Sequence, residues 1–126
     1  MSVANLDRSI DWYQNMLGFK LIEKTEFKAI NSKVAFIEGL GFKLELLQIN
    51  DGFKLPEMFA DPPKHMLPIG NKAIVLYTDD LTGVTKMLED QNAVFAFKMQ
   101  KLTDDGLRTT LIRDIDGNFI SILGKD

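Results

Sequence analysis

The sequence predicts an α+β fold built from two copies of one β-α-β-β-β module. The first observation is a stretch of helical periodicity that ends at Gly18 and runs directly into residues of strand-like composition. The second is that this pattern returns 75 residues later, so that Leu6 corresponds to Leu81 and Phe19 to Val94. A helix that is followed directly by a strand is half of a β-α-β unit, and the sequence contains two copies of this unit.

Both helices are predicted from a single apolar stripe. The first helix is expected near 7–17, with Asn5 or Asp7 as its cap and Gly18 in the left-handed conformation that ends it. Its stripe has the spacing i, i+4, i+7 and i+11 and consists of Leu6, Ile10, Tyr13 and Leu17. The second helix is expected at 81–91, with Asn92 close to the position that the glycine has in the first copy. Its stripe consists of Leu81, Val84 and Leu88.

Strands account for the remaining elements. They are expected at 19–27, 34–37, 42–48, 72–78, 94–100, 107–113 and 119–123, separated by glycine- and aspartate-rich turns. The strand that should precede the first helix is almost missing, because the 75-residue offset pairs Thr78 with Val3. We therefore expect the first strand of module one to be truncated, which leaves an unpaired sheet edge.

At 126 residues the chain has the length of a single domain. We expect module one at 1–49, a connecting loop at 50–70 and module two at 71–126. The loop contains all four prolines and the only histidine, His65. A loop of about 20 residues is usually a lid or a linker. We favour a linker that packs its apolar residues on the sheet, with one helical turn at Pro56–Phe59.

The composition excludes several classes of protein. There is no cysteine, which rules out disulfides, thiol catalysis and zinc-thiolate sites. The net charge of −3, without a basic stripe, argues against nucleic acid as a partner. No apolar run approaches the ~18 residues of a membrane span. We expect a cytoplasmic protein that binds neither nucleic acid nor membrane.

Three motifs connect the chain with a known family. They are Ser9-Ile10-Asp11-Trp12-Tyr13, Leu17-Gly18-Phe19 and Asp114-Ile115-Asp116-Gly117-Asn118. With the two-module layout, they make the chain resemble the vicinal oxygen chelate superfamily, which includes glyoxalase I, bleomycin-resistance proteins and extradiol dioxygenases. Ile115 stands where the family usually has proline. The resemblance implies paired βαβββ modules whose mixed sheets curl around one cleft, frequently with dimerisation, but it implies no particular activity.

The resemblance also indicates where a metal would be held. Enzymes of this family use side chains from the first and last strands of each module, and a divalent cation needs about three or four such ligands. Here one position would lie before Met1, and two others hold Ala73 and Ser121. Glu45 is the only surviving candidate ligand. The sequence is equally consistent with Glu45 being an ordinary strand residue that pairs with a neighbouring lysine or arginine. We therefore expect no metal. The alternative is an incomplete or relocated site for Ni, Zn, Mn or Fe.

Strand alternation predicts what lines the cleft. The predicted ligand-binding residues are Glu45, Leu47, Val75, Tyr77, Phe119 and Ser121, with His65 from the loop. The residues between them should pack under the helices: Leu44, Leu46, Ile74, Leu76, Ile120 and Ile122. His65 in a proline-rich loop is more often a solvated or packing residue than a ligand contact. An apolar, aromatic cleft with one carboxylate suits an apolar or cationic small molecule.

The sequence therefore favours a metal-free small-molecule-binding protein of the glyoxalase/bleomycin-resistance type, with no catalytic residue assigned. The alternative is a divergent metal-dependent lyase or dioxygenase, and a third possibility is a scaffold that dimerises. We expect a homodimer, because the open sheet edge and the off-stripe Trp12 would give a monomer exposed surface.

Overall fold

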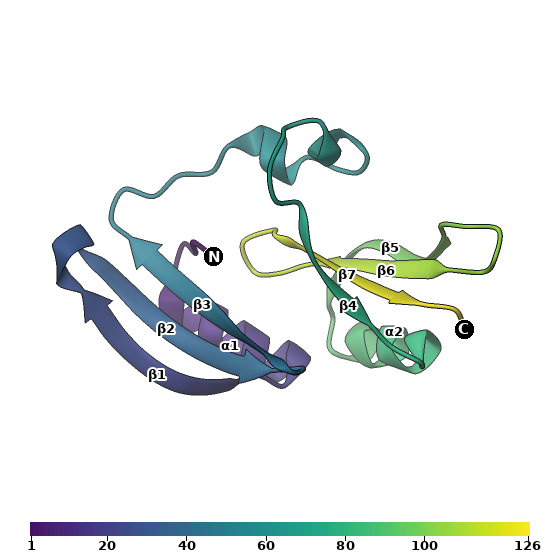
Figure 1. Cartoon of the computed structure of the whole chain (residues 1–126), viewed down its shortest axis with the longest axis horizontal. Coiled ribbons are helices and arrows are strands. Elements are labelled where there is room, and N and C mark those ends of the chain that lie inside the picture. Colours follow the sequence, from purple (N-terminus) through teal and green to yellow (C-terminus); the bar gives the residue numbers. More distant parts are fainter. The chain divides into compact units, whose positions relative to one another are not determined.

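The computed structural model describes all 126 residues, which divide into two compact units, Met1–Lys54 and Leu55–Asp126. Each unit has one long helix and one sheet (Figure 1). The predicted α+β fold of two β-α-β-β-β modules is confirmed. No helix has the length and apolar character needed to cross a membrane.

The first unit holds a three-stranded antiparallel sheet in the order β1-β2-β3. Its elements are α1 (Leu6–Leu17), β1 (Lys20–Phe27), β2 (Ser32–Gly39) and β3 (Phe42–Ile49), with a short 3-10 turn at Lys28–Ile30. Ahead of α1, Ser2 forms a short parallel bridge to Leu47 of β3, where the sequence predicted the remainder of a strand. In this bridge the Val3 amide donates to the Leu47 carbonyl at 2.9 Å, and the Leu47 amide donates to the Met1 carbonyl at 3.0 Å.

Local chemistry explains why α1 begins and ends where it does. The Asn5 side chain accepts a hydrogen bond from the Arg8 amide at 3.0 Å, which caps the first turn. Gly18 has a φ of 72°, a left-handed conformation that suits glycine and ends the helix. The helix buries its apolar stripe against β2 and β3. The buried residues of this core include Leu6, Ile10, Tyr13, Ala35, Ile37 and Leu46.

The second unit holds a four-stranded sheet in the order β4-β7-β6-β5, in which β4 and β7 run parallel and the other pairs antiparallel. Its elements are β4 (Ala73–Tyr77), α2 (Leu81–Asp90), β5 (Val94–Lys101), β6 (Arg108–Arg113) and β7 (Phe119–Gly124). Two 3-10 turns precede the sheet, η2 (Pro56–Phe59) and η3 (Lys64–Met66). The first is the turn expected from the sequence.

A buried hydroxyl pair lies between α2 and the sheet. Thr85 Oγ1 and Thr110 Oγ1 are 2.6 Å apart, and Thr110 also accepts a hydrogen bond from the Met99 amide at 3.2 Å. Met99 has a φ of 52° and lies where the register between β5 and β6 shifts. The hydroxyl pair therefore holds the irregular part of β5 in place.

The loop between β6 and β7 is organised by a buried aspartate. Asp114 Oδ1 accepts hydrogen bonds from the amides of Asp116 and Asn118, both at 2.9 Å. Gly117 has a φ of 90°. The turn therefore needs an aspartate that accepts both amide hydrogen bonds and a glycine that tolerates a positive φ. Both are present in its sequence, Asp-x-Asp-Gly-Asn.

Equivalent hydrogen bonds relate the two modules to each other. The Thr78 amide donates to the Leu123 carbonyl at 3.0 Å, as the Val3 amide does to that of Leu47. Residues of the last strands therefore correspond at an offset of 76. Glu45 of module one matches Ser121 of module two.

Candidate functional site

The predicted ligand-binding residues fall into two groups, one in each unit. Glu45 and Leu47 lie on β3 in the first unit, and the other five lie in the second. Glu45 is exposed and pairs in register with Phe36, on the face of the sheet opposite to Leu46 and α1. Leu47 is half-buried on that same face.

In the second unit, strands β4 and β7 bring four of the predicted residues onto one face. The parallel register pairs Val75 with Ser121, and Ala73 with Phe119. Val75 and Tyr77 are 50% and 77% exposed, so this face presents apolar and aromatic surface. Phe119, by contrast, is only 2% exposed.

His65 is the group that covers Phe119. Its ring centroid is 4.5 Å from that of Phe119, and His65 itself is only 7% exposed. Burial, followed by the positive charges of Lys72 and Arg113, lowers the pKa of His65 below its usual 6.5. The imidazole is therefore neutral at pH 7, and it packs on the sheet.

Two residues that were not among the predicted ligand-binding residues lie next to this group. Thr109 Oγ1 lies 2.9 Å from Ser121 Oγ, and the Arg113 guanidinium lies 4.2 Å from the centre of the Phe119 ring. Thr109 and Arg113 lie on the same face of β6, and this is the face that Ser121 and Phe119 share. The period-two alternation of β6 was the signal that could have found them.

The residues present do not fit the divalent metal that the family's enzymes use. Glu45 is matched in module two by Ser121, whose hydroxyl lies within hydrogen-bonding distance of Thr109. Ala73, at the first-strand position, has no donor atom. No group of three or more histidine, cysteine, aspartate or glutamate side chains is placed to hold a metal ion. The donor set therefore supplies one carboxylate where three or four ligands are required.

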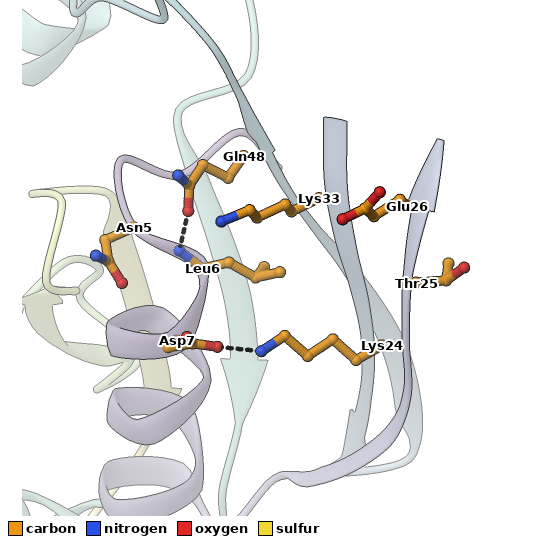
Figure 2. Close-up of a pocket in the computed structure, with 8 residues that line it drawn as sticks. All are labelled: Asn5, Leu6, Asp7, Lys24, Thr25, Glu26, Lys33 and Gln48. Atoms are coloured by element: carbon orange, nitrogen blue, oxygen red, sulfur yellow. Dashed lines mark hydrogen bonds and ion pairs between the residues drawn. The ribbon is translucent and has the colours of Figure 1, made fainter. Parts of the chain in front are cut away.

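The first unit contains a polar pocket that the sequence did not predict. It has a volume of about 380 Å³. Figure 2 shows it beside the first turn of α1. It is lined by Asn5, Leu6, Asp7, Lys24, Thr25, Glu26, Lys33 and Gln48. Lys24 pairs in register with Ala35, and Lys33 with Gln48. These positions place the pocket on the helix side of the sheet, opposite to Glu45.

Hydrogen bonds within this pocket tie the helix to the sheet. Lys24 forms an ion pair with Asp7, which lowers the pKa of the Asp7 carboxyl. Gln48 Oε1 accepts a hydrogen bond from the Leu6 amide at 2.7 Å (Figure 2). The pocket is therefore hydrophilic, unlike the apolar surface expected from the sequence. Its residues come from four separated parts of the chain, so no local motif indicates it.

Solved structures with the same fold are found across several organisms. TioX from Micromonospora sp. ML1 shares 18% identity with a TM-score of 0.69, covering 100% of this chain and 94% of that one. Leishmania major glyoxalase I, described as trypanothione-dependent, shares 20% identity with a TM-score of 0.67, covering 99% and 82%. A glyoxalase family protein from Enterococcus faecalis shares 16% identity with a TM-score of 0.78, covering 97% and 90%. At these identities the likeness concerns the fold.

No curated protein matches the chain in sequence. The family model of the Glyoxalase/Bleomycin resistance protein/Dioxygenase superfamily matches residues 1–122. This match covers nearly the whole chain, and the two modules of the structure agree with it. The chain belongs to the glyoxalase/bleomycin resistance protein/dioxygenase superfamily.

Proposed function

We propose that this protein binds an apolar or cationic small molecule without using a metal. The observation that carries the proposal is the face formed by β4 and β7. There Val75 and Tyr77 expose apolar and aromatic surface beside the half-buried Ser121. Surface of this kind favours apolar ligands and, through the tyrosine ring, cationic ones.

The residues at the metal-ligand positions support the metal-free part of the proposal. Ser121 and Ala73 replace potential ligands in module two, so the carboxylate of Glu45 has no partner ligand at its equivalent position. In this proposal Glu45 acts as the counter-ion of a cationic ligand rather than as a metal ligand.

Fluorescence titration with two dyes of opposite charge tests the ligand class. We expect the cationic dye rhodamine 6G to bind more tightly than the anionic dye 1-anilinonaphthalene-8-sulfonate. Tyr77→Ala should weaken the binding of both dyes.

Glu45→Gln keeps the side chain's shape, removes its charge and should weaken the binding of the cationic dye alone, by about tenfold. Glu26→Gln is the matched control, because it removes a carboxylate on the helix side of the first unit's sheet. Equal binding of the cationic dye to wild type and Glu45→Gln would refute the counter-ion role.

Calorimetry with manganese, nickel and zinc tests the absence of a metal. We expect no stoichiometric binding to the wild type. Stoichiometric binding that is lost in Glu45→Gln would overturn the proposal and favour a lyase or dioxygenase with a relocated metal site. Independently of the metal titration, native mass spectrometry of the purified protein would identify any small molecule that copurifies.

We also propose that the protein is a homodimer. Strand β1 is an open edge of the first sheet, and it exposes Leu21 and Ile22 by 41% and 52%. An exposed apolar edge of this kind is commonly covered by a partner. Sedimentation velocity at high micromolar concentration should give the mass of a dimer. A monomer at that concentration would contradict the proposal.

A further inference from the structure

In the second unit, residues 55–70 are held on the sheet by Arg113. Its Nη1 donates to the Phe59 carbonyl at 2.9 Å, and its Nη2 forms an ion pair with Asp61 Oδ1 at 2.9 Å. Nη1 also donates to the Gly117 carbonyl at 3.2 Å, which fixes the guanidinium on its own hairpin. One side chain thus anchors the segment to the end of β6.

His65 forms the second attachment of this segment. It is 7% exposed and packs on the ring of Phe119, which is itself 2% exposed. The Nδ1 atom of His65 is buried and has no hydrogen-bond partner. This attachment therefore depends on the close packing of a neutral ring, because a charged imidazole at this position would be buried without a hydrogen bond to Nδ1.

The charged groups around His65 oppose its protonation. Lys72 lies ahead of β4 and Arg113 lies on β6, and both are cations. The adjoining segment contributes two carboxylates: Asp61 is paired with Arg113, and Glu57 is exposed. Strand β7 contributes Phe119 and no ionisable side chain, and Lys64 on the histidine's own turn is exposed. A protonated imidazole here would be a buried cation beside two others, without an acceptor for Nδ1.

We propose that residues 55–70 form a pH-operated cover over Phe119, docked while His65 is neutral and released when His65 is protonated. The docked state disfavours the proton, whereas a released imidazole takes it up near pH 6.5. Docking is therefore independent of pH above about 6.5 and weakens below it, by about tenfold per pH unit. The proposal depends only on geometry within the second unit and stands apart from the proposed ligand binding.

Two measurements on the full chain test this cover. His65 is the only histidine, so its Cε1–H resonance can be followed by NMR without ambiguity. We expect it to titrate below pH 6.5. Hydrogen exchange between pH 7.5 and 5.0, corrected for intrinsic rates, should accelerate in residues 55–70 as the pH falls, by up to about tenfold per unit. The amides of β6 are the internal reference and should not change.

His65→Phe separates protonation from packing, because it keeps an aromatic ring on Phe119 but cannot take up a proton. Its exchange in 55–70 should not depend on pH, whereas the control Lys64→Gln should behave like the wild type. Titration of His65 at or above pH 6.5 would overturn the proposal, and this result needs no variant. Equal acceleration in wild type and His65→Phe would also overturn it.

Discussion

At one pair of equivalent buried positions, module one has Ile10 and Ala35 where module two has Thr85 and Thr110. All four residues are at most 5% exposed. The threonine pair is tolerated because the two hydroxyls bond each other. The same packing position therefore accepts either apolar atoms or polar atoms that satisfy one another.

The modules differ in a second way at the positions expected to carry function. Glu45 of module one is an exposed carboxylate residue, whereas Ser121 of module two lies within hydrogen-bonding distance of Thr109. In module two, residues 55–70 also pack on the sheet through Arg113 and His65. The framework has thus been kept in both copies while the groups available to a ligand have diverged.

The largest effect is expected at the first position of each helix. Leu6 and Leu81 are equivalent and almost fully buried, at 1% and 0% exposure. Leu6→Ala and Leu81→Ala should each lower the free energy of unfolding by about 3 kcal/mol, because each leaves a cavity. Urea unfolding followed by circular dichroism measures this. A loss below about 1 kcal/mol in only one variant would show that the two cores are not equivalent.

The hydroxyl pair should show an intermediate effect. Thr110→Val should cost about 2 kcal/mol, because it leaves the Met99 amide without a partner and leaves the Thr85 hydroxyl only the weak acceptor Met99 Sδ at 3.5 Å. Thr85→Val leaves Thr110 bonded to Met99 and should cost about 1 kcal/mol. The exposed Thr82→Val on α2 is the control and should be nearly neutral. The reverse order of the two buried variants in thermal unfolding would be inconsistent with this network.

The helix ends offer a smaller comparison. Gly18 and Asn92 both have left-handed backbone, with φ of 72° and 58°. Gly18→Ala should destabilise by about 1 kcal/mol through backbone strain alone, since a Cβ there meets no atom within 4 Å. Asn92→Gly should stabilise by a few tenths of a kcal/mol. Thermal unfolding of both variants measures the difference, and a neutral Gly18→Ala would argue against strain as the reason for glycine.

The smallest effect concerns two exposed carboxylates. Hydrogen bonds from Lys125 and Thr103 lower the pKa of Asp105 to about 2, and Lys24 lowers that of Asp7. Because the folded-state pKa lies below the unfolded value of 3.8, this stabilisation is present above pH 3.8 and is lost as the pH falls towards 2. NMR titration of Lys125→Met should show a raised Asp105 pKa and an unchanged Asp7. An unchanged Asp105 would rule out Lys125 as the main cause.

The sequence predicted the helices almost to the residue, since 7–17 and 81–91 became Leu6–Leu17 and Leu81–Asp90. The range predicted for β2 was too short: the strand was expected at 34–37 and spans Ser32–Gly39. Polar residues such as Lys33 and Glu38 extend that strand because their backbones pair with neighbours on both sides. An apolar pattern does not detect pairing through polar residues.

The site was predicted less completely than the fold. Strand alternation correctly placed Val75 and Ser121 on one face, because a period of two is a local property. The bonds of Arg113 to Phe59 and Asp61 join residues more than 50 positions apart, and nothing in either segment alone specifies them. The polar pocket of the first unit escaped prediction for the same reason.

The position of the only tryptophan gives this protein a built-in optical reporter. Trp12 lies on α1, with its ring centroid 4.9 Å from that of Tyr13, in the first unit. The second unit contains no tryptophan and one tyrosine, Tyr77. Indole fluorescence excited at the red edge therefore follows the melting of module one alone, while backbone circular dichroism follows both. Coincidence of the two curves would show that the modules unfold as one cooperative body.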